Sequence, residues 1–139
     1  MLYPIKIFVE GYADKRFLSD YIKHILPSIT IDKDMFINSE GRCKSSEAFK
    51  NKMIQNSDNK GVNLVIFDAD NDFGSIEQEI KRDFQDANFN LFLFPNNKSN
   101  GALEDLLENS IADVNKDILS VGTVIKCVYQ ARKYLEEQI

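Results

Sequence analysis

The sequence contains no tryptophan, a single histidine and only two cysteines among its 139 residues. Because Cys43 and Cys127 lie far apart, they predict neither a disulfide framework nor a zinc site. No apolar run approaches the roughly 18 residues that a membrane span requires. The first residues also lack the basic segment and cleavage site of a signal peptide. We therefore expect a cytoplasmic protein with reduced thiols and no membrane partner.

An excess of basic residues is also missing, because the formal net charge is −5. Such a balance does not indicate nucleic-acid binding, which usually leaves a basic footprint. The charges are unevenly distributed, however. Residues 41–61 carry five cations and two acids, whereas residues 66–86 carry seven acids and two cations. Solvated helix faces would explain both segments as well as a binding surface would.

Short β-rich runs alternate with segments of helical periodicity. Strands are expected over residues 5–10, 35–38, 63–67 and 90–94. Helices are expected over residues 14–26, 45–54, 75–84 and 101–111 and within 121–139, with Ser45 or Ser46 and Ser75 as N-caps. This order predicts an α/β sandwich with a mainly parallel sheet of four or more strands and helices on both faces. We expect one domain over residues 1–139, which could also be the N-terminal part of a longer protein.

Carboxylates follow three of the expected strands. Glu10 and Gly11 end the first, with Asp14 one helical turn later; Asp68, Asp70 and Asp72 follow the third; Glu104 and Asp105 come after the fourth. Sites in open α/β sheets form at the carboxyl ends of the strands. If the first and third strands are neighbours, Glu10 and the aspartates converge. Carboxylates without a nearby His or Cys are the ligand set of a hard cation, Mg²⁺ or Mn²⁺.

Four other interpretations compete for the aspartate run. An EF-hand would use Asp68, Asp70, Asp72 and Glu79, but Gly74 is one place late and a strand precedes the run. A phosphatase with an aspartyl nucleophile and a phosphorylatable receiver domain both need further residues that match poorly. Simple capping of the next helix explains one aspartate well and three poorly.

The segments "FVEGYADKRFL" and "LVIFDADND" together resemble the Toprim domain. This metal-binding module occurs in topoisomerases, bacterial primases, small ribosomal-RNA maturases and the overcoming-lysogenization-defect nucleases. The family pattern is a glutamate and glycine after strand one, an acid shortly afterwards and Asp-x-Asp after strand three, matched here by Glu10, Gly11, Asp14, Asp68 and Asp70. The segment "FPNNKSNGALEDLLE" is similar to small stand-alone bacterial Toprim-like proteins of undefined function. The resemblance implies a Rossmann-like three-layer sandwich.

It also implies metal-dependent phosphodiester chemistry on DNA or RNA, most like that of a nuclease. The chain has no zinc-binding cysteine module and no companion domain with a nucleophilic tyrosine, so the primase and topoisomerase branches fit less well. The implied catalytic residues are Glu10, Asp68 and Asp70. The implied ligands of Mg²⁺ or Mn²⁺ are Glu10, Asp14, Asp68, Asp70, Asp72 and Glu104. Candidate phosphate contacts are Lys15, Arg42, Lys44 and Lys98.

Two functions remain open from the sequence. The first is a nuclease, which in this family often acts with a partner ATPase. The second is a non-catalytic module that keeps the fold for nucleic-acid or protein interaction. The single histidine, His24, lies mid-helix with no group to orient it as a base, so we expect it to be a packing or surface residue.

Overall fold

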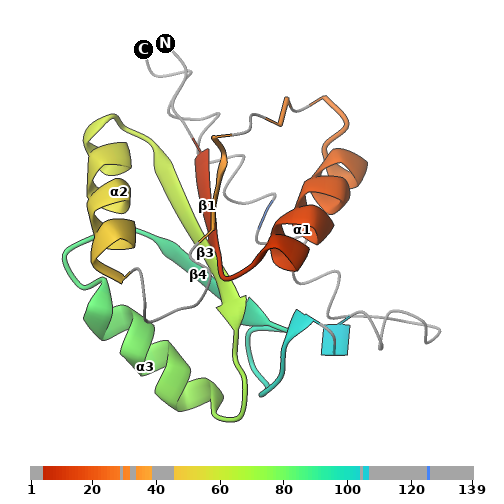
Figure 1. Cartoon of the computed structure of the whole chain (residues 1–139), viewed down its shortest axis with the longest axis vertical. Coiled ribbons are helices and arrows are strands. Elements are labelled where there is room, and N and C mark those ends of the chain that lie inside the picture. Colours follow the sequence, from red (N-terminus) through yellow and green to blue (C-terminus); the bar gives the residue numbers. More distant parts are fainter. Residues whose placement is uncertain are drawn as a thin grey trace.

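The computed structural model describes residues 5–28, 30, 31, 34–38, 46–103, 105, 106 and 125. In chain order the elements are β1 (Ile5–Val9), α1 (Tyr12–Ile25), β2 (Phe36–Asn38), α2 (Ser46–Asp58), β3 (Val62–Asp68), α3 (Phe73–Asp83) and β4 (Asn90–Phe94) (Figure 1). The four strands form one parallel sheet in the order β2-β1-β3-β4. The predicted α/β fold is therefore confirmed.

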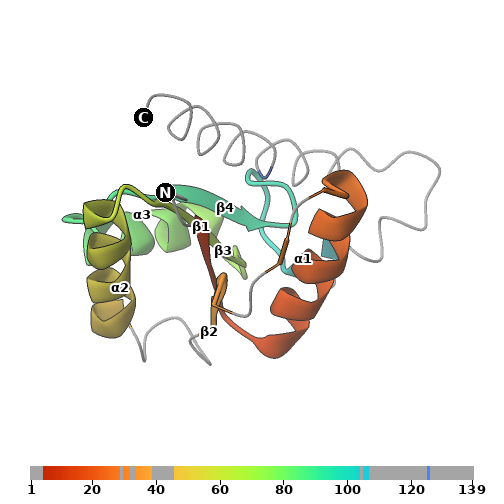
Figure 2. The same ribbon diagram turned by 90° about the horizontal axis from the view of Figure 1, so that it is seen from above.

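The helices cover both faces of the sheet, with α1 on one side and α2 and α3 on the other (Figure 2). Side chains alternate between the faces along each strand, because successive residues of a strand point in opposite directions. Ile7, Val9 and Ile66 belong to the core that packs against α1. Phe8 and Val65 belong to the core under α2 and α3. Each strand of the sheet's interior is thus apolar on both faces, as buried parallel strands require.

The strand order reverses between β1 and β3. From β1 the chain moves to β2 on one side, and then returns to β3 and β4 on the other. β1 and β3 pair directly, with Ile5 opposite Val62 and Val9 opposite Ile66. The first and third expected strands are therefore neighbours, which is the condition for Glu10 and the aspartates to converge. Ligand sites of open α/β sheets lie at the carboxyl ends of the strands at such a reversal, so this point of the fold is the first place to look for a site.

Helix α1 begins two residues earlier than expected. Gly11 precedes it in an extended conformation, and Asp14 Oδ2 accepts a hydrogen bond of 3.1 Å from the backbone N–H of Gly11. That contact satisfies a backbone donor which the first turn of a helix would otherwise leave unpaired. The helix ends at Ile25, shortly before Pro27, as expected.

A pair of buried amides joins α2 to the beginning of β3. Asn56 and Asn63 are only 4% and 2% exposed, and Asn56 Nδ2 donates to Asn63 Oδ1 at 2.9 Å. Asn63 Nδ2 lies within hydrogen-bond distance of the carbonyls of Met53 and Asn88. A Cβ atom on Gly61 would come within 2.4 Å of Asn56 Oδ1, so this close approach of backbone to amide requires glycine.

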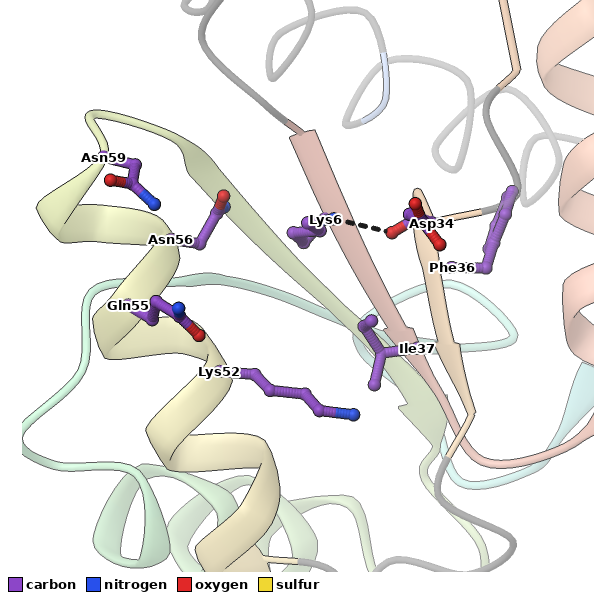
Figure 3. A pocket seen from close by; sticks show the side chains of 8 residues that line it. All are labelled: Lys6, Asp34, Phe36, Ile37, Lys52, Gln55, Asn56 and Asn59. Atoms are coloured by element: carbon purple, nitrogen blue, oxygen red, sulfur yellow. Dashed lines mark hydrogen bonds between the residues drawn. The ribbon is translucent and has the colours of Figure 1, made fainter.

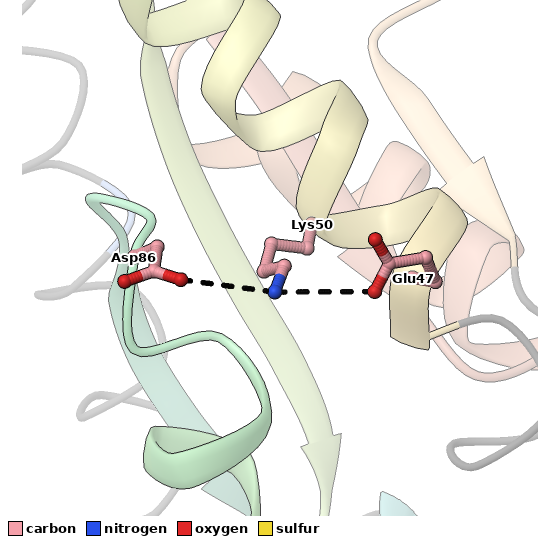
Figure 4. Close-up of polar contacts among 3 residues, drawn as sticks. All are labelled: Glu47, Lys50 and Asp86. Atoms are coloured by element: carbon pink, nitrogen blue, oxygen red, sulfur yellow. Dashed lines mark ion pairs between the residues drawn. The ribbon is translucent and has the colours of Figure 1, made fainter.

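An exposed set of ion pairs links α2 to the turn before β4. Lys50 Nζ lies 3.9 Å from Glu47 and 3.8 Å from Asp86 (Figure 4). Both acids are largely exposed, so we expect each pair to contribute less than about 1 kcal/mol. In the part of the chain that the structure describes, no helix combines the length and the apolar character needed to cross a membrane.

Candidate functional site

The side chain of Glu10 joins the ends of the two central strands. Glu10 follows β1 directly, and Asp68 is the last residue of β3. Glu10 Oε1 accepts a hydrogen bond of 2.7 Å from the backbone N–H of Asp68. Glu10 and Asp68 are 58 positions apart in the sequence, and they lie together at the point where the strand order reverses. This is the juxtaposition that the sequence predicted.

Asp68 is half-buried and surrounded by other acids. Its Oδ1 accepts a hydrogen bond of 3.0 Å from the backbone N–H of Leu103. The pKa of Asp68 is raised to about 7, first by burial and then by the nearby carboxylates of Asp14, Glu10 and, more weakly, Asp70. The hydrogen bond from Leu103 opposes this shift. An acid with such a pKa destabilises the fold when ionised, unless positive charge is brought to it.

Asp14 completes the buried part of this acidic group. It lies in the first turn of α1 and is only 8% exposed. Besides accepting the hydrogen bond from Gly11, it is the strongest charged influence on the pKa of Asp68. Glu10, Asp14 and Asp68 therefore form one electrostatic unit, which we call the carboxylate cluster. Its members come from the residue after β1, the first turn of α1 and the last residue of β3.

Asp70 is held in place through its backbone. Its φ is +55°, a left-handed conformation that residues other than glycine adopt uncommonly. The N–H of Asp70 donates to the carbonyl of Gly101 and its carbonyl accepts from the N–H of Gly101, both at 2.7 Å. These two backbone hydrogen bonds hold the turn after β3 against the loop after β4. The Asp70 side chain itself is exposed.

Asp72 is the N-cap of α3. Its carboxylate accepts hydrogen bonds from Ser75, at 3.1 Å from the backbone N–H and at 2.9 Å from the hydroxyl. These bonds lower the pKa of Asp72, the backbone bond having the larger effect. The expectation that Ser75 caps this helix was wrong, because α3 begins at Phe73 and Ser75 is the donor. Capping thus accounts for one of the three aspartates.

The loop after β4 makes polar contacts that sequence reasoning missed. Asn100 Oδ1 accepts from the backbone N–H of Phe73 at 2.7 Å, and Asn100 Nδ2 donates to the carbonyl of Asn71 at 2.8 Å. Asp105 accepts from the backbone N–H of Ala102 at 2.8 Å, within its own turn. The run of Asn, Ser and Gly in "PNNKSNG" is typical of such a loop, but gives no sign of its partner. Glu104, the other acid expected here, lies outside the described residues.

Two of the four candidate phosphate contacts can be located. Lys15 lies on α1 and lines a shallow hollow of about 210 Å³ with Tyr12, Arg16, Ser19 and Asp20. Tyr12 is 69% exposed, two residues after Glu10. Lys98 is exposed in the loop after β4. Arg42 and Lys44 lie outside the described residues.

Comparison with known proteins places the chain in one family. A family model described as a protein of unknown function (DUF3226) matches residues 4–137. The chain belongs to the DUF3226 family. The search of curated proteins and the search of solved structures each found no match to it. Family membership therefore extends over nearly the whole chain of this DUF3226 protein and carries no activity with it.

The calcium-loop interpretation of the DUF3226 aspartate run is wrong. An EF-hand loop needs Asp68 and Glu79 at the two ends of twelve residues of loop. Here Asp68 belongs to β3, and Glu79 lies within α3, which begins at Phe73. The run is therefore a strand end, a short turn and a helix start.

The carboxylate cluster fits a hard divalent cation by its chemistry. Its donors are all oxygen atoms. The negative charges of Asp14 and Glu10 contribute to the raised pKa of Asp68, and a bound cation would offset those charges. Within the described residues, no group of three or more His, Cys, Asp or Glu side chains is arranged so that it could hold a metal ion. The contacts of Glu10 and Asp72 are with backbone and hydroxyl donors instead. The hydrogen bond from the Asp68 N–H engages only one of the two carboxylate oxygens of Glu10, Oε1.

Proposed function

We propose that this protein is a nuclease that hydrolyses phosphodiester bonds of DNA or RNA with Mg²⁺ or Mn²⁺, and that it is related to the Toprim nucleases. The observation that carries the proposal is the contact of Glu10 with Asp68 at the strand reversal. Asp14 lies close enough to Asp68 to raise the pKa of that carboxyl. Three acids in one half-buried place are unfavourable for the fold alone, and active sites are where such groups are found.

Each acid has a proposed role. Glu10 and Asp68 would hold the cation, and Asp70 would join them from the turn after β3. A divalent cation bound there would neutralise charge on the phosphate and lower the pKa of a bound water. Asp14 remains buried at the start of α1, where it positions Gly11 and adds negative charge to the cluster. We leave Asp72 out of this set because its carboxylate caps α3.

The first turns of α1 supply a surface for the nucleic acid. Lys15 and Arg16 are cations that would contact phosphates there, and the exposed Lys98 in the loop after β4 is a further proposed contact. Arg42 and Lys44 remain proposed contacts on the sequence alone. The exposed ring of Tyr12 lines the same hollow as Lys15 and Arg16 and offers a face on which an unpaired base could stack.

The partner and the location are proposals of the same kind. Toprim nucleases often act with an ATPase, and we propose such a partner for this protein. A cytoplasmic location is supported by the two distant cysteines, which predict no disulfide framework.

A second function is favoured by a different observation. The carboxylates of Glu10 and Asp72 are engaged by donors of the protein itself, and the described residues contain no ready metal-binding group. Both facts favour a structural role in which the acids stabilise the strand end and the helix start by hydrogen bonds. Such a protein would keep the fold as a nucleic-acid or protein interaction unit without catalysis.

Cleavage of end-labelled oligonucleotides distinguishes the two functions. Single- and double-stranded DNA and RNA would be incubated with Mg²⁺ or Mn²⁺, with the protein alone and with an ATPase encoded beside it. We expect cleavage that EDTA abolishes and that Glu10→Gln and Asp68→Asn each reduce by roughly a hundredfold or more. Glu47→Gln and Asp86→Asn are matched controls, because both acids are exposed members of the Lys50 ion pairs. If every substrate stays intact in every combination, the nuclease proposal is wrong and the interaction module is the better account.

A further inference from the structure

A second hollow lies away from the carboxylate cluster. It is a cavity of about 460 Å³ between α2 and the β1–β2 side of the sheet (Figure 3). Lys6, the second residue of β1, contributes to its lining, four residues before Glu10. At about 3.3 Å per strand residue the two places are roughly 13 Å apart along β1. The volume falls in the range of about 300–1,000 Å³ that small-molecule sites occupy.

One face of α2 presents unpaired polar side chains to this cavity. Lys52 and Gln55 of α2 line it, three residues apart, and so does Asn59, the residue directly after the helix, whose N–H donates to the Gln55 carbonyl at 3.2 Å (Figure 3). None of these three side chains makes a hydrogen bond or ion pair with any residue that the structure describes. The neighbouring Asn56 differs, because its amide donates to the Val62 carbonyl and to Asn63.

The opposite wall supplies a cation and an apolar surface. Lys6 reaches the cavity from β1, where its Nζ donates to the backbone carbonyl of Asp34 at 2.8 Å. Ile37 of β2 adds a partly buried apolar side chain. Lys6 and Lys52 outnumber the one acid of the lining, Asp34, in a chain whose net charge is −5. The cavity is therefore a local departure from the acidic character of the molecule.

These groups select a class of ligand. Lysine ammonium groups bind phosphate as point charges. The amides of Gln55 and Asn59 each offer donors and an acceptor, which match the mixed donors and acceptors on the edge of a nucleobase. Ile37 provides a surface for the apolar face of a ring. We propose that this cavity binds a nucleoside monophosphate, with its phosphate at Lys52 and Lys6 and its base against Ile37 and the amides of Gln55 and Asn59.

Calorimetric titration of the intact protein tests this site. AMP, GMP, CMP and UMP would each be added in EDTA, which keeps divalent cations away from the carboxylate cluster. We expect at least one nucleotide to bind saturably at one site per chain, and adenosine and inorganic phosphate to bind at least about tenfold more weakly. Lys52→Ala should weaken binding about tenfold or more, as loss of a charged phosphate contact does. Asn59→Ala should weaken it about fivefold.

Two control variants make the result specific. Lys23→Ala removes an exposed lysine from α1, on the other face of the sheet, and should bind the nucleotide as the wild type does. Glu10→Gln should also bind the nucleotide as the wild type does. The test of nucleotide binding is therefore independent of the test of nuclease activity. The proposal is overturned if none of the four nucleotides binds, if Lys52→Ala and Lys23→Ala have equal affinity, or if inorganic phosphate binds as tightly as the nucleotides.

Discussion

The carboxylate of Glu10 accepts a hydrogen bond of 2.7 Å from the backbone N–H of Asp68. This contact connects the residue after β1 to the last residue of β3, where the order of the strands reverses. It also brings a negative charge to an aspartate that is already half-buried and near Asp14. The geometry thus concentrates acids at the place where α/β proteins build sites, at the ends of two paired strands that are packed between two hydrophobic cores.

The raised pKa of Asp68 predicts how stability depends on pH without divalent cations. The folded protein keeps a proton on Asp68 up to a pKa of about 7, whereas the unfolded chain releases it near the ordinary value of 3.8. Stability should therefore fall as pH rises from about 4 to about 7 and level off above that range. Asp68→Asn should flatten this dependence and stabilise the protein at pH 8 by roughly 1 kcal/mol, after allowance for screening by solvent.

Urea unfolding in EDTA across this pH range measures the effect. Asparagine keeps an oxygen that can accept from the N–H of Leu103. The variant and the wild type therefore differ in the charge at this position and not in this hydrogen bond. Asp86→Asn, a change on the exposed surface, should follow the wild-type curve. A variant Asp68→Asn that is less stable than the wild type at pH 8 would refute the account of an electrostatically strained cluster.

The capping role of Asp72 leads to a separate prediction. Asp72→Ala should lower the free energy of unfolding, because the N–H of Ser75 loses its acceptor at the start of α3. Its affinity for Mn²⁺ should stay within about twofold of the wild type. Thermal unfolding gives the first quantity and metal titration the second. A tenfold loss of Mn²⁺ affinity would instead make Asp72 a ligand.

How far the sequence predicts this molecule can be seen element by element. The short apolar runs of β1 and β3 and the i, i+4 spacing of Ile76, Ile80 and Phe84 are local patterns, so the elements and their order were predictable. β4 was predicted to the residue, because Pro95 follows it. The N-terminal ends of α1 and α3 were placed two residues late. Their caps depend on Asp14 and Asp72, which were assigned to chemistry rather than to helix starts.

The site was predictable only where it depended on strand order. The convergence of Glu10 and Asp68 follows from alternating strands and helices, whereas the link between Asp70 and Gly101 depends on a loop whose path no periodicity encodes. The same holds for Asn63. An asparagine at a strand start gives no sign that it will be 2% exposed and bonded to α2. Such contacts are set by how loops and helices dock, which local propensity does not determine.

Base stacking on Tyr12 is expected if nucleic acid crosses the start of α1. Tyr12→Ala should weaken binding of a fluorescent single-stranded oligonucleotide by about fivefold or more, as loss of one stacked base typically does. Tyr12→Phe keeps the ring and should bind as the wild type does. Binding of duplex DNA, whose bases are already stacked, should hardly change. Fluorescence anisotropy in EDTA separates this effect from cleavage, and equal losses for alanine and phenylalanine would argue against stacking.

The central claim is that Glu10 and Asp68 share one divalent cation, and Mn²⁺ binding followed by electron paramagnetic resonance tests it most directly. The signal of free Mn²⁺ falls as the ion binds, so the affinity of each variant can be read from one titration. We predict one site of highest affinity in the wild type, retained in Glu47→Gln and Asp86→Asn and weakened at least about tenfold in Glu10→Gln and in Asp68→Asn. Equal Mn²⁺ binding by all five proteins, or none by the wild type, would contradict the account.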